Sequence, residues 1–228
     1  MRRLRYALTL ALGLFVAAPA MTAPAHADDT PQLLVDKSLG SLRAILNEKG
    51  LEPAREHLKQ AKGVLIVPDL IKAGFILGGQ AGDGVLLTRG ADGSWSGPAF
   101  YQVIAGSIGL QAGVESRETI FLVMSDAGLK KLMQNEMKLG ADASVAVGGV
   151  GAGVGAASAG NPEADILVYA KSKGLFGGGA LEGGVVKPKP EMNKAYYGAD
   201  VTAEGIVMGG GRTPAGSAEL RKELAAND

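Results

Sequence analysis

The residues that most often carry catalysis are scarce in this chain. Cysteine does not occur, and histidine occurs twice, at His26 and His57. The chain therefore has no means to form a disulfide, a thiolate zinc site, an iron–sulfur cluster or a cysteine nucleophile. One histidine beyond residue 27 is too few for a histidine-rich metal site. We expect His57 to be an ordinary surface or half-buried residue of a helix.

Serine and nucleotide motifs are equally weak. The sequence contains neither Gly-x-Ser-x-Gly nor Ser-x-x-Lys, so serine hydrolase chemistry has no motif. Residues 151–156 match Gly-x-Gly-x-x-Ala, but Gly160-Asn161-Pro162 interrupts the helix that a dinucleotide site requires. The carboxylates lie singly among the predicted strands, and an uncharacterised hydrolase built on a carboxylate pair stays a minor alternative. Examples are Asp69, Asp83, Glu115 and Asp142.

A basic, amphipathic stretch at residues 31–62 is the better candidate for function. Apolar residues recur there at helical spacing, at Val35, Leu39, Leu42 and Leu46. Six basic residues accompany four acidic ones; the basic ones are Lys37, Arg43, Lys49, Arg55, Lys59 and Lys62. A helix lying in a membrane interface has this construction, with cations at the head groups. A helix packed on a sheet would show the same stripe, so both interpretations stay open.

The hydrophobic periodicity divides the rest of the chain into strands with helices at the margins. Helices are predicted at 31–47, 53–62, 126–136 and 215–226, and a short helix or a turn is predicted at 190–197. Strands are predicted at 63–67, 74–80, 84–89, 99–115, 119–125, 165–171 and 175–187. Residues 143–157 are predicted as a strand, with a glycine-rich loop at 148–156 as the alternative. Because most strands follow one another without intervening helices, the fold class is α+β with an antiparallel sheet.

Glycine is the unusual feature of the composition, with 35 residues of 228. Many lie inside predicted strands, where glycine permits bulges, tight coiling and close backbone approach. We therefore expect a strongly coiled sheet or small barrel, with an N-terminal amphipathic helical pair and a C-terminal helix. The formal net charge of +0 lacks the basic excess of a nucleic-acid-binding protein.

The first 27 residues have the composition of a secretory signal peptide. Met1 to Arg5 is basic, Tyr6 to Ala18 is apolar, and Ala25-His26-Ala27 offers small residues for cleavage. We expect cleavage after Ala27 and export to the periplasm or the exterior. The predicted organisation is thus a signal peptide at 1–27, one domain at 28–210, and a charged C-terminal helix or tail at 211–228.

Several blocks of the sequence, in order, resemble the SYLF-domain family. They are AKGVLIVP at 61–68, IKAGF at 71–75, GVLL at 84–87, GSWSGPA at 93–99, KLGADASVA at 138–146, KSKGLF at 171–176, LEG at 181–183 and AYYG at 195–198. The resemblance extends over about four-fifths of the predicted mature chain. It implies a lipid-binding module: eukaryotic members bind phosphoinositides, the yeast branch also associates with actin, and bacterial members resemble envelope proteins. The family supplies no catalytic residues.

The resemblance favours a membrane role for the basic stretch. The expected head-group contacts are Lys37, Arg43, Lys49, Arg55, Lys59, Lys62 and Lys72, with Lys171 and Lys173 as a second group. Leu39, Leu42 and Leu46 would form the inserting or packing face. Trp95, the only tryptophan, is expected to cap one end of the sheet, with an interfacial anchor as the alternative.

The sequence thus predicts an exported, non-enzymatic module, without cofactor or metal, that associates peripherally with anionic phospholipid surfaces. The alternative is a structural or protein-interaction factor of the envelope that does not bind lipid directly. Burial of Leu39 and Leu42 against the sheet would favour this alternative, and exposure would favour lipid binding.

Overall fold

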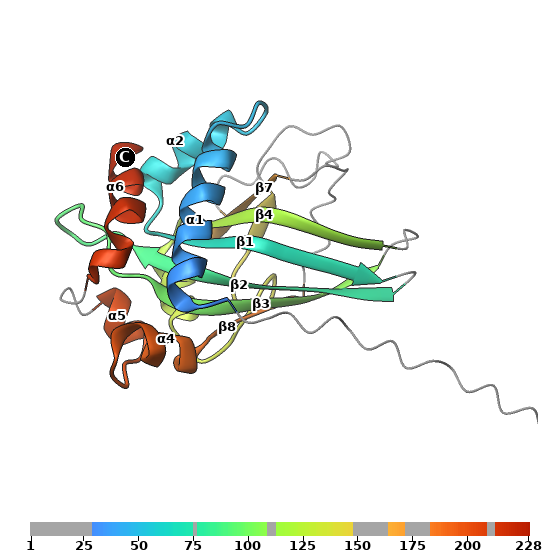
Figure 1. The fold of residues 1–228 in the computed structure, drawn as a ribbon. Coiled ribbons are helices and arrows are strands. Elements are labelled where there is room, and N and C mark those ends of the chain that lie inside the picture. Colours follow the sequence, from blue (N-terminus) through green and yellow to red (C-terminus); the bar gives the residue numbers. More distant parts are fainter. Residues whose placement is uncertain (1–28, 75–76, 109–112, 148–163, 172–182, 209–212) are drawn as a thin grey trace, which may run out of the picture.

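A computed structural model describes residues 29–74, 77–108, 113–147, 164–171, 183–208 and 213–228 (Figure 1). The predicted signal peptide at 1–27 lies outside these residues. So do Lys173 and the glycine-rich stretch at 148–156, whose assignment as strand or loop is therefore not addressed.

The described residues form one strongly curled, eight-stranded sheet, a half-barrel that confirms the predicted α+β fold class. Its strands are β1 (Gly63–Gly74), β2 (Leu77–Thr88), β3 (Ala99–Ile108), β4 (Gly113–Val123), β5 (Met137–Lys138), β6 (Val145–Val147), β7 (Ile166–Lys171) and β8 (Val185–Pro188). Their order across the sheet is β5-β8-β3-β2-β1-β4-β7-β6. All neighbours are antiparallel except β6 and β7, which are parallel. The chain between Val147 and Ile166 is long enough for the crossover that parallel pairing requires.

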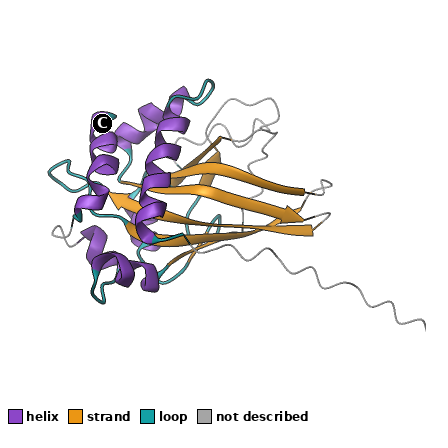
Figure 2. Cartoon of the chain, viewed as in Figure 1, coloured by secondary structure: helices purple, strands orange, loops and turns teal. Residues whose placement is uncertain are grey.

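The helices gather at one end of the sheet (Figure 2). They are α1 (Pro31–Leu46), α2 (Glu52–Gln60), α3 (Asp126–Leu132), α4 (Pro190–Tyr197), α5 (Ala203–Met208) and α6 (Ala218–Ala226), with a 3-10 turn at Ala215–Ser217. Thr30 caps α1, because its side chain accepts a hydrogen bond from the Leu33 amide. Pro31 then occupies the first turn, where the missing N–H costs nothing.

Each face of the sheet has its own hydrophobic core. On the first face, α1, α2, α4 and α6 cover side chains such as Val85, Phe100 and Ile120. On the second face, Leu65, Tyr101 and Phe121 pack with α5 and with the chain around β5. Leu220 and Leu224 of α6 belong to the first core, so the charged C-terminal helix is packed into the same domain as α1. We call the side of the sheet that carries α1 the helix face.

Glycine in β2 serves close packing, and this changes the predicted strand boundaries. We predicted separate strands at 74–80 and 84–89, but β2 runs unbroken from Leu77 to Thr88, through Gly82 and Gly84. A Cβ on Gly82 would lie 2.6 Å from the Asp69 carbonyl oxygen, and one on Gly84 would lie 2.5 Å from the Ile66 carbonyl oxygen. Because β1 has a register shift between Ile66 and Ile71, its backbone presses against β2 there, and only glycine fits.

The helical layer covers only half of the helix face. Beyond α1, the long strands β1 to β4 continue outward, and no helix formed by the described residues lies over them (Figure 1). One cross-strand row runs there through Val185, Ile104, Ala81, Ile71 and Ser116. The next row contains Gly106, Gly79 and Ala73. We call these two rows the outer half of the helix face, and the part beneath the helices the inner half.

Candidate functional site

The apolar stripe of α1 packs on the sheet. Leu42 is 0% exposed and Leu46 is 6% exposed, and both lie in the core of the helix face. Leu39 is partly buried against the same core. Of the two roles considered for this stripe, packing is therefore the one that the structure shows. Leu42 and Leu46 have no surface with which to enter a membrane in this conformation.

Most of the predicted head-group cations are paired with carboxylates. The pairs are Lys37 with Asp29 (2.8 Å) and Asp69 (3.1 Å), Arg43 with Glu223 (2.7 Å), Lys59 with Glu56 (3.1 Å), Lys62 with Asp126 (3.2 Å) and Lys171 with Glu48 (3.1 Å). Several of these partners are distant in the sequence, and no local pattern indicated them. The positive charge counted in the sequence is thus largely neutralised in the fold.

The remaining predicted head-group cations within the described residues, Arg55, Lys49 and Lys72, lie in three different environments. Arg55 donates to the Leu46 carbonyl oxygen at 3.2 Å and so helps to terminate α1. Lys49 is exposed in the loop that follows. Lys72 is half-buried near Glu115, whose pKa is lowered chiefly by a hydrogen bond from Arg117 and to a smaller extent by the charge of Lys72. The structure therefore does not gather these residues into one cationic surface.

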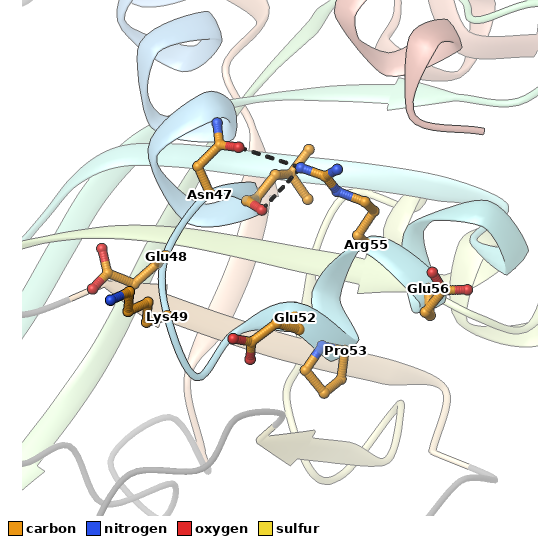
Figure 3. A pocket seen from close by; sticks show the side chains of 8 residues that line it. Asn47, Glu48, Lys49, Glu52, Pro53, Arg55 and Glu56 are labelled. Atoms are coloured by element: carbon orange, nitrogen blue, oxygen red, sulfur yellow. Dashed lines mark hydrogen bonds between the residues drawn. The ribbon is translucent and has the colours of Figure 1, made fainter.

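An open cavity of about 660 Å³ lies at the turn between α1 and α2 (Figure 3). Its lining consists of Leu46, Asn47, Glu48, Lys49, Glu52, Pro53, Arg55 and Glu56. The carboxylates outnumber the cations there, which does not suit an anionic head group. Glu52 accepts a hydrogen bond from the Gly50 amide, which holds the pKa of its carboxyl below the usual value. These contacts stabilise the turn between the two helices.

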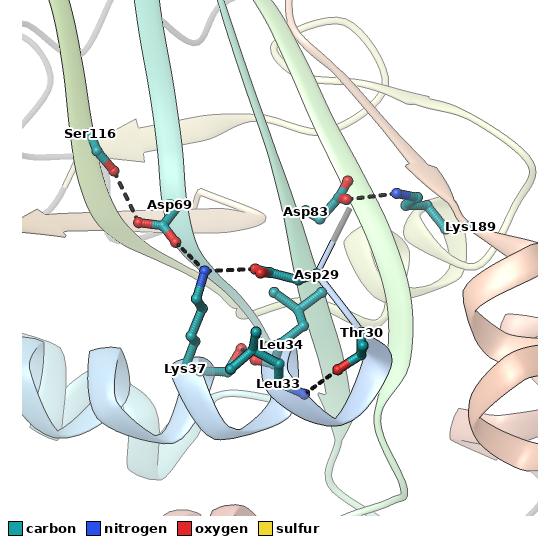
Figure 4. Close-up of polar contacts among 10 residues, drawn as sticks. Asp29, Thr30, Leu33, Leu34, Lys37, Asp69, Asp83, Ser116 and Lys189 are labelled. Atoms are coloured by element: carbon teal, nitrogen blue, oxygen red, sulfur yellow. Dashed lines mark hydrogen bonds and ion pairs between the residues drawn. The ribbon is translucent and has the colours of Figure 1, made fainter. Parts of the chain in front are cut away.

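A cluster of charged side chains marks the border between the inner and outer halves (Figure 4). Lys37 reaches from α1 to Asp29 and to Asp69, and Ser116 donates a hydrogen bond to Asp69. The hydrogen bond with Asp29 is the largest cause of a raised pKa of Lys37. This cluster fixes the start of α1 to β1.

His57 and Trp95 both make contacts that stabilise the fold. His57 is half-buried, as we predicted, and its Nδ1 atom forms a hydrogen bond with the buried Tyr169 hydroxyl. Burial raises the pKa of Tyr169 to about 12. Trp95 is 2% exposed and packs beneath Arg89, with 4.9 Å from the guanidinium carbon to the ring centroid. It caps the inner end of the sheet, and the interfacial-anchor interpretation was wrong.

Two kinds of structure are absent from the described residues. There, no group of three or more His, Cys, Asp or Glu side chains is placed to hold a metal ion. In the same part of the chain, none of the helices combines the length and the apolar character needed to cross a bilayer.

Comparisons with known proteins agree on one family. The family model described as "Ysc84: Las17-binding protein actin regulator" matches residues 104–227. The LAS seventeen-binding protein 3 of Saccharomyces cerevisiae is 36% identical over 161 residues, covering 69% of this chain and 35% of that protein. Protein YSC84 of the same yeast is 34% identical, covering 73% and 36%. The human SH3 domain-containing YSC84-like protein 1 is 30% identical, covering 73% and 49%. The chain thus spans less than half the length of these relatives.

Proposed function

The chain belongs to the SYLF-domain (Ysc84) family, and from this premise we propose that it is a non-enzymatic binding module that docks to another protein. The proposal includes export, because residues 1–27 have the composition of a signal peptide. We place the mature protein in the periplasm or outside the cell, and the proposal includes no cofactor.

The division of the helix face is the observation that supports protein docking. The inner half is used by α1, and the surrounding cations are held by carboxylates. The outer half offers exposed, uncharged surface around Ile104, which is 40% exposed. Uncharged surface bordered by polar residues is typical of protein interaction sites. The name of the matched family refers to Las17 binding and actin regulation. From it we take only that proteins are partners of this domain.

Photo-crosslinking in the source cells tests this proposal. A photoreactive amino acid is placed at Ile104 in one variant and at Ser94 in the other, since Ser94 is exposed in the loop at the inner end of the sheet. We expect a discrete crosslinked protein, identified by mass spectrometry, from the Ile104 position alone. Equal crosslinking at both positions, or none at Ile104, would contradict docking at the outer half.

An anionic phospholipid surface is the second candidate partner, and the exposure of the paired cations favours it. The side chains of Arg43, Lys59 and Lys62 are 51%, 44% and 42% exposed despite their partners. Surface ion pairs of this kind contribute only about 0–1 kcal/mol, so a lipid phosphate could replace the carboxylate. Lys49 is also exposed, in the loop that follows α1. This candidate predicts binding that is electrostatic and independent of the α1 stripe.

Co-sedimentation of residues 28–228 with neutral and anionic vesicles distinguishes the two candidates. Lipid binding through the cations requires anionic vesicles and falls at 1 M salt, where screening shortens electrostatic reach to ~3 Å. The variant Lys59→Glu would then bind less, whereas Lys222→Glu, on exposed α6 surface, would not. Protein that stays in the supernatant under all conditions would exclude the lipid candidate and leave protein docking.

A further inference from the structure

The outer part of β3 has a backbone edge that no strand of the described chain covers. β8 pairs with β3 only from Tyr101 to Ile104. Beyond that point the chain leaves β3: Gly183 has a φ of +76°, and its amide donates a hydrogen bond to the Leu139 carbonyl oxygen, next to β5. Residues 105–108 of β3 therefore have β2 on one side and, among the described strands, none on the other.

The backbone hydrogen-bonding groups of Gly106 point toward this open edge. The Phe100 carbonyl oxygen accepts a hydrogen bond from the Lys189 amide at 2.8 Å, so Phe100 faces β8. Because successive residues of a strand face alternate neighbours, Ile104 and Gly106 share that direction. Ile104 pairs with Val185, whereas Gly106 has no described residue opposite it on this side. The N–H and C=O groups of Gly106 are thus placed to pair with an added strand.

The same edge lacks the usual protection against strand addition. Exposed edges in proteins commonly carry lysine, proline or an inward-pointing charge. The segment Ala105-Gly106-Ser107-Ile108 contains none of these. We propose that this edge binds an extended segment of another protein, which adds one strand to the sheet beside β3. Strand addition presupposes the protein docking proposed above and gives that docking its form.

The cross-strand row that begins at Gly106 selects a large apolar side chain in the added strand. Gly106 pairs with Gly79, which pairs with Ala73, so two adjacent strands offer no side chain in this row. A Cβ on Gly106 would meet no atom within 4 Å. Because neighbouring strands lie ~4.8 Å apart, an aromatic ring on the residue opposite Gly106 would extend across it toward Gly79, beside the exposed Ile104. Aromatic side chains cover glycine in a neighbouring strand in this way.

Charges beside the edge favour an acidic residue at one end of the added strand. Lys138 of β5 and Lys187 of β8 are exposed on the helix face there. The neighbouring carboxylates already have partners: Asp83 binds Lys189 at 2.6 Å, and Asp142 accepts a hydrogen bond from the Lys138 amide at 2.7 Å. We therefore expect the partner segment to carry its acidic residue at the end next to β8.

Crosslinking from position 104 in the source cells, combined with a second substitution, tests strand addition. The photoreactive amino acid replaces Ile104 in three chains, which carry Gly106, Gly106→Ala or Gly106→Pro. Proline removes the N–H group that the added strand needs, and it is tolerated at an edge where this group faces outward. Alanine keeps the N–H group and is the matched control. Circular dichroism of the purified chains verifies folding.

We expect the yield of the crosslinked partner to change by less than about twofold with Gly106→Ala. It should fall about fivefold with Gly106→Pro, as for the loss of one backbone hydrogen bond. Equal yields with alanine and proline would overturn strand addition, although docking at the outer half would stand. A missing crosslink in the chain with Gly106 would contradict the docking itself. A crosslink to a second copy of this chain would also overturn the inference.

Two further variants leave the backbone intact and apply even if Gly106→Pro does not fold. Gly106→Leu fills the row that the partner's aromatic ring would occupy, and it should lower the yield several-fold. Lys138→Glu repels the acidic end of the partner segment and should lower the yield, whereas Lys222→Glu, on exposed α6 surface, should not. An undiminished yield with both Gly106→Leu and Lys138→Glu would overturn the inference.

Discussion

The inner and outer halves of the helix face are built from the same four strands but have opposite surroundings. Val85 of β2 and Phe100 of β3 are both 0% exposed beneath the helices. Four residues further along the same strands, Ala81 is exposed and Ile104 is 40% exposed. The backbone pairing between β2 and β3 continues unchanged through both regions. The sheet therefore provides a continuous platform, and the position of the helices determines which part of this face is core.

The side chains follow this division. β2 carries Leu87 and Val85 where the helices cover it, and Ala81 and Gly79 where they do not. Small residues reduce the apolar area that an open sheet presents to water, which limits nonspecific association. On the second face, by contrast, Val103 and Ala105 of the same part of β3 remain buried. The open region is thus confined to one face of the sheet, as expected for a docking surface.

Truncation of a leucine at each end of α1 should give the largest difference between the halves. Leu42→Ala removes a fully buried side chain and should lower the free energy of unfolding by about 2–5 kcal/mol. Leu33→Ala, at a side chain that is 45% exposed, should lower it by less than about 1 kcal/mol. Urea unfolding measures both values. Similar losses for the two variants would show that Leu33 is also core.

Two glycines of the sheet should respond oppositely to a methyl group. Gly84→Ala forces a Cβ against the Ile66 carbonyl oxygen and should destabilise the protein by about 1–3 kcal/mol. Gly106→Ala meets no atom within 4 Å and should be nearly neutral, within about 0.5 kcal/mol. Thermal unfolding of the two variants, side by side, measures the difference. A neutral Gly84→Ala would mean that β1 and β2 can separate at the bulge.

The Asp165 carboxylate should make the free energy of unfolding decrease at acid pH. Asp165 accepts hydrogen bonds from the Ser125 hydroxyl and from the Ser144 amide, which lower its pKa. Because the folded pKa is depressed, this stabilisation is present above the unfolded pKa of ~3.9 and is lost as pH falls through the folded value. Urea midpoints between neutral and acid pH should therefore fall less steeply for Asp165→Asn. Identical slopes would assign the acid sensitivity to other carboxylates.

The ion pair between α1 and α6 should have the smallest effect. Arg43 and Glu223 meet at 2.7 Å, but the Arg43 side chain is 51% exposed. A double-mutant cycle with Arg43→Ala and Glu223→Ala should give a coupling of about 0.2–1 kcal/mol, which decreases with added salt. A coupling well above this range would indicate that the pair holds α6 in place.

Local patterns predicted the helices better than the strands. The stripe and the proline starts place α1 and α4 within one residue of their predicted bounds. The strand predictions treated glycine as a boundary, and β2 was divided wrongly because its glycines respond to the backbone of β1. Residues 99–115 were predicted as one strand, since no Asp, Asn or Pro marks the break between β3 and β4. α5 was not predicted, because its six residues are too few for a clear period.

The candidate site was less predictable than the fold. A leucine stripe has the same spacing whether it faces a sheet or a membrane, so burial of Leu42 could be decided only by the tertiary structure. The neutralisation of Arg43 and Lys62 depends on Glu223 and Asp126, which no short-range rule connects to them. The outer half could not be predicted from the sequence, because alanine and glycine on an exposed strand surface have no pattern that distinguishes them from the same residues in a turn.

The contact between α1 and α6 also has a kinetic consequence. Arg43 and Glu223 are separated by 180 positions in the sequence. The strands β1 and β4 are paired in the sheet, although β2 and β3 lie between them in the sequence. Folds dominated by such nonlocal contacts form slowly, on the order of milliseconds to seconds. The chain therefore spends longer unfolded after synthesis than a protein of the same length that is built from local helical contacts.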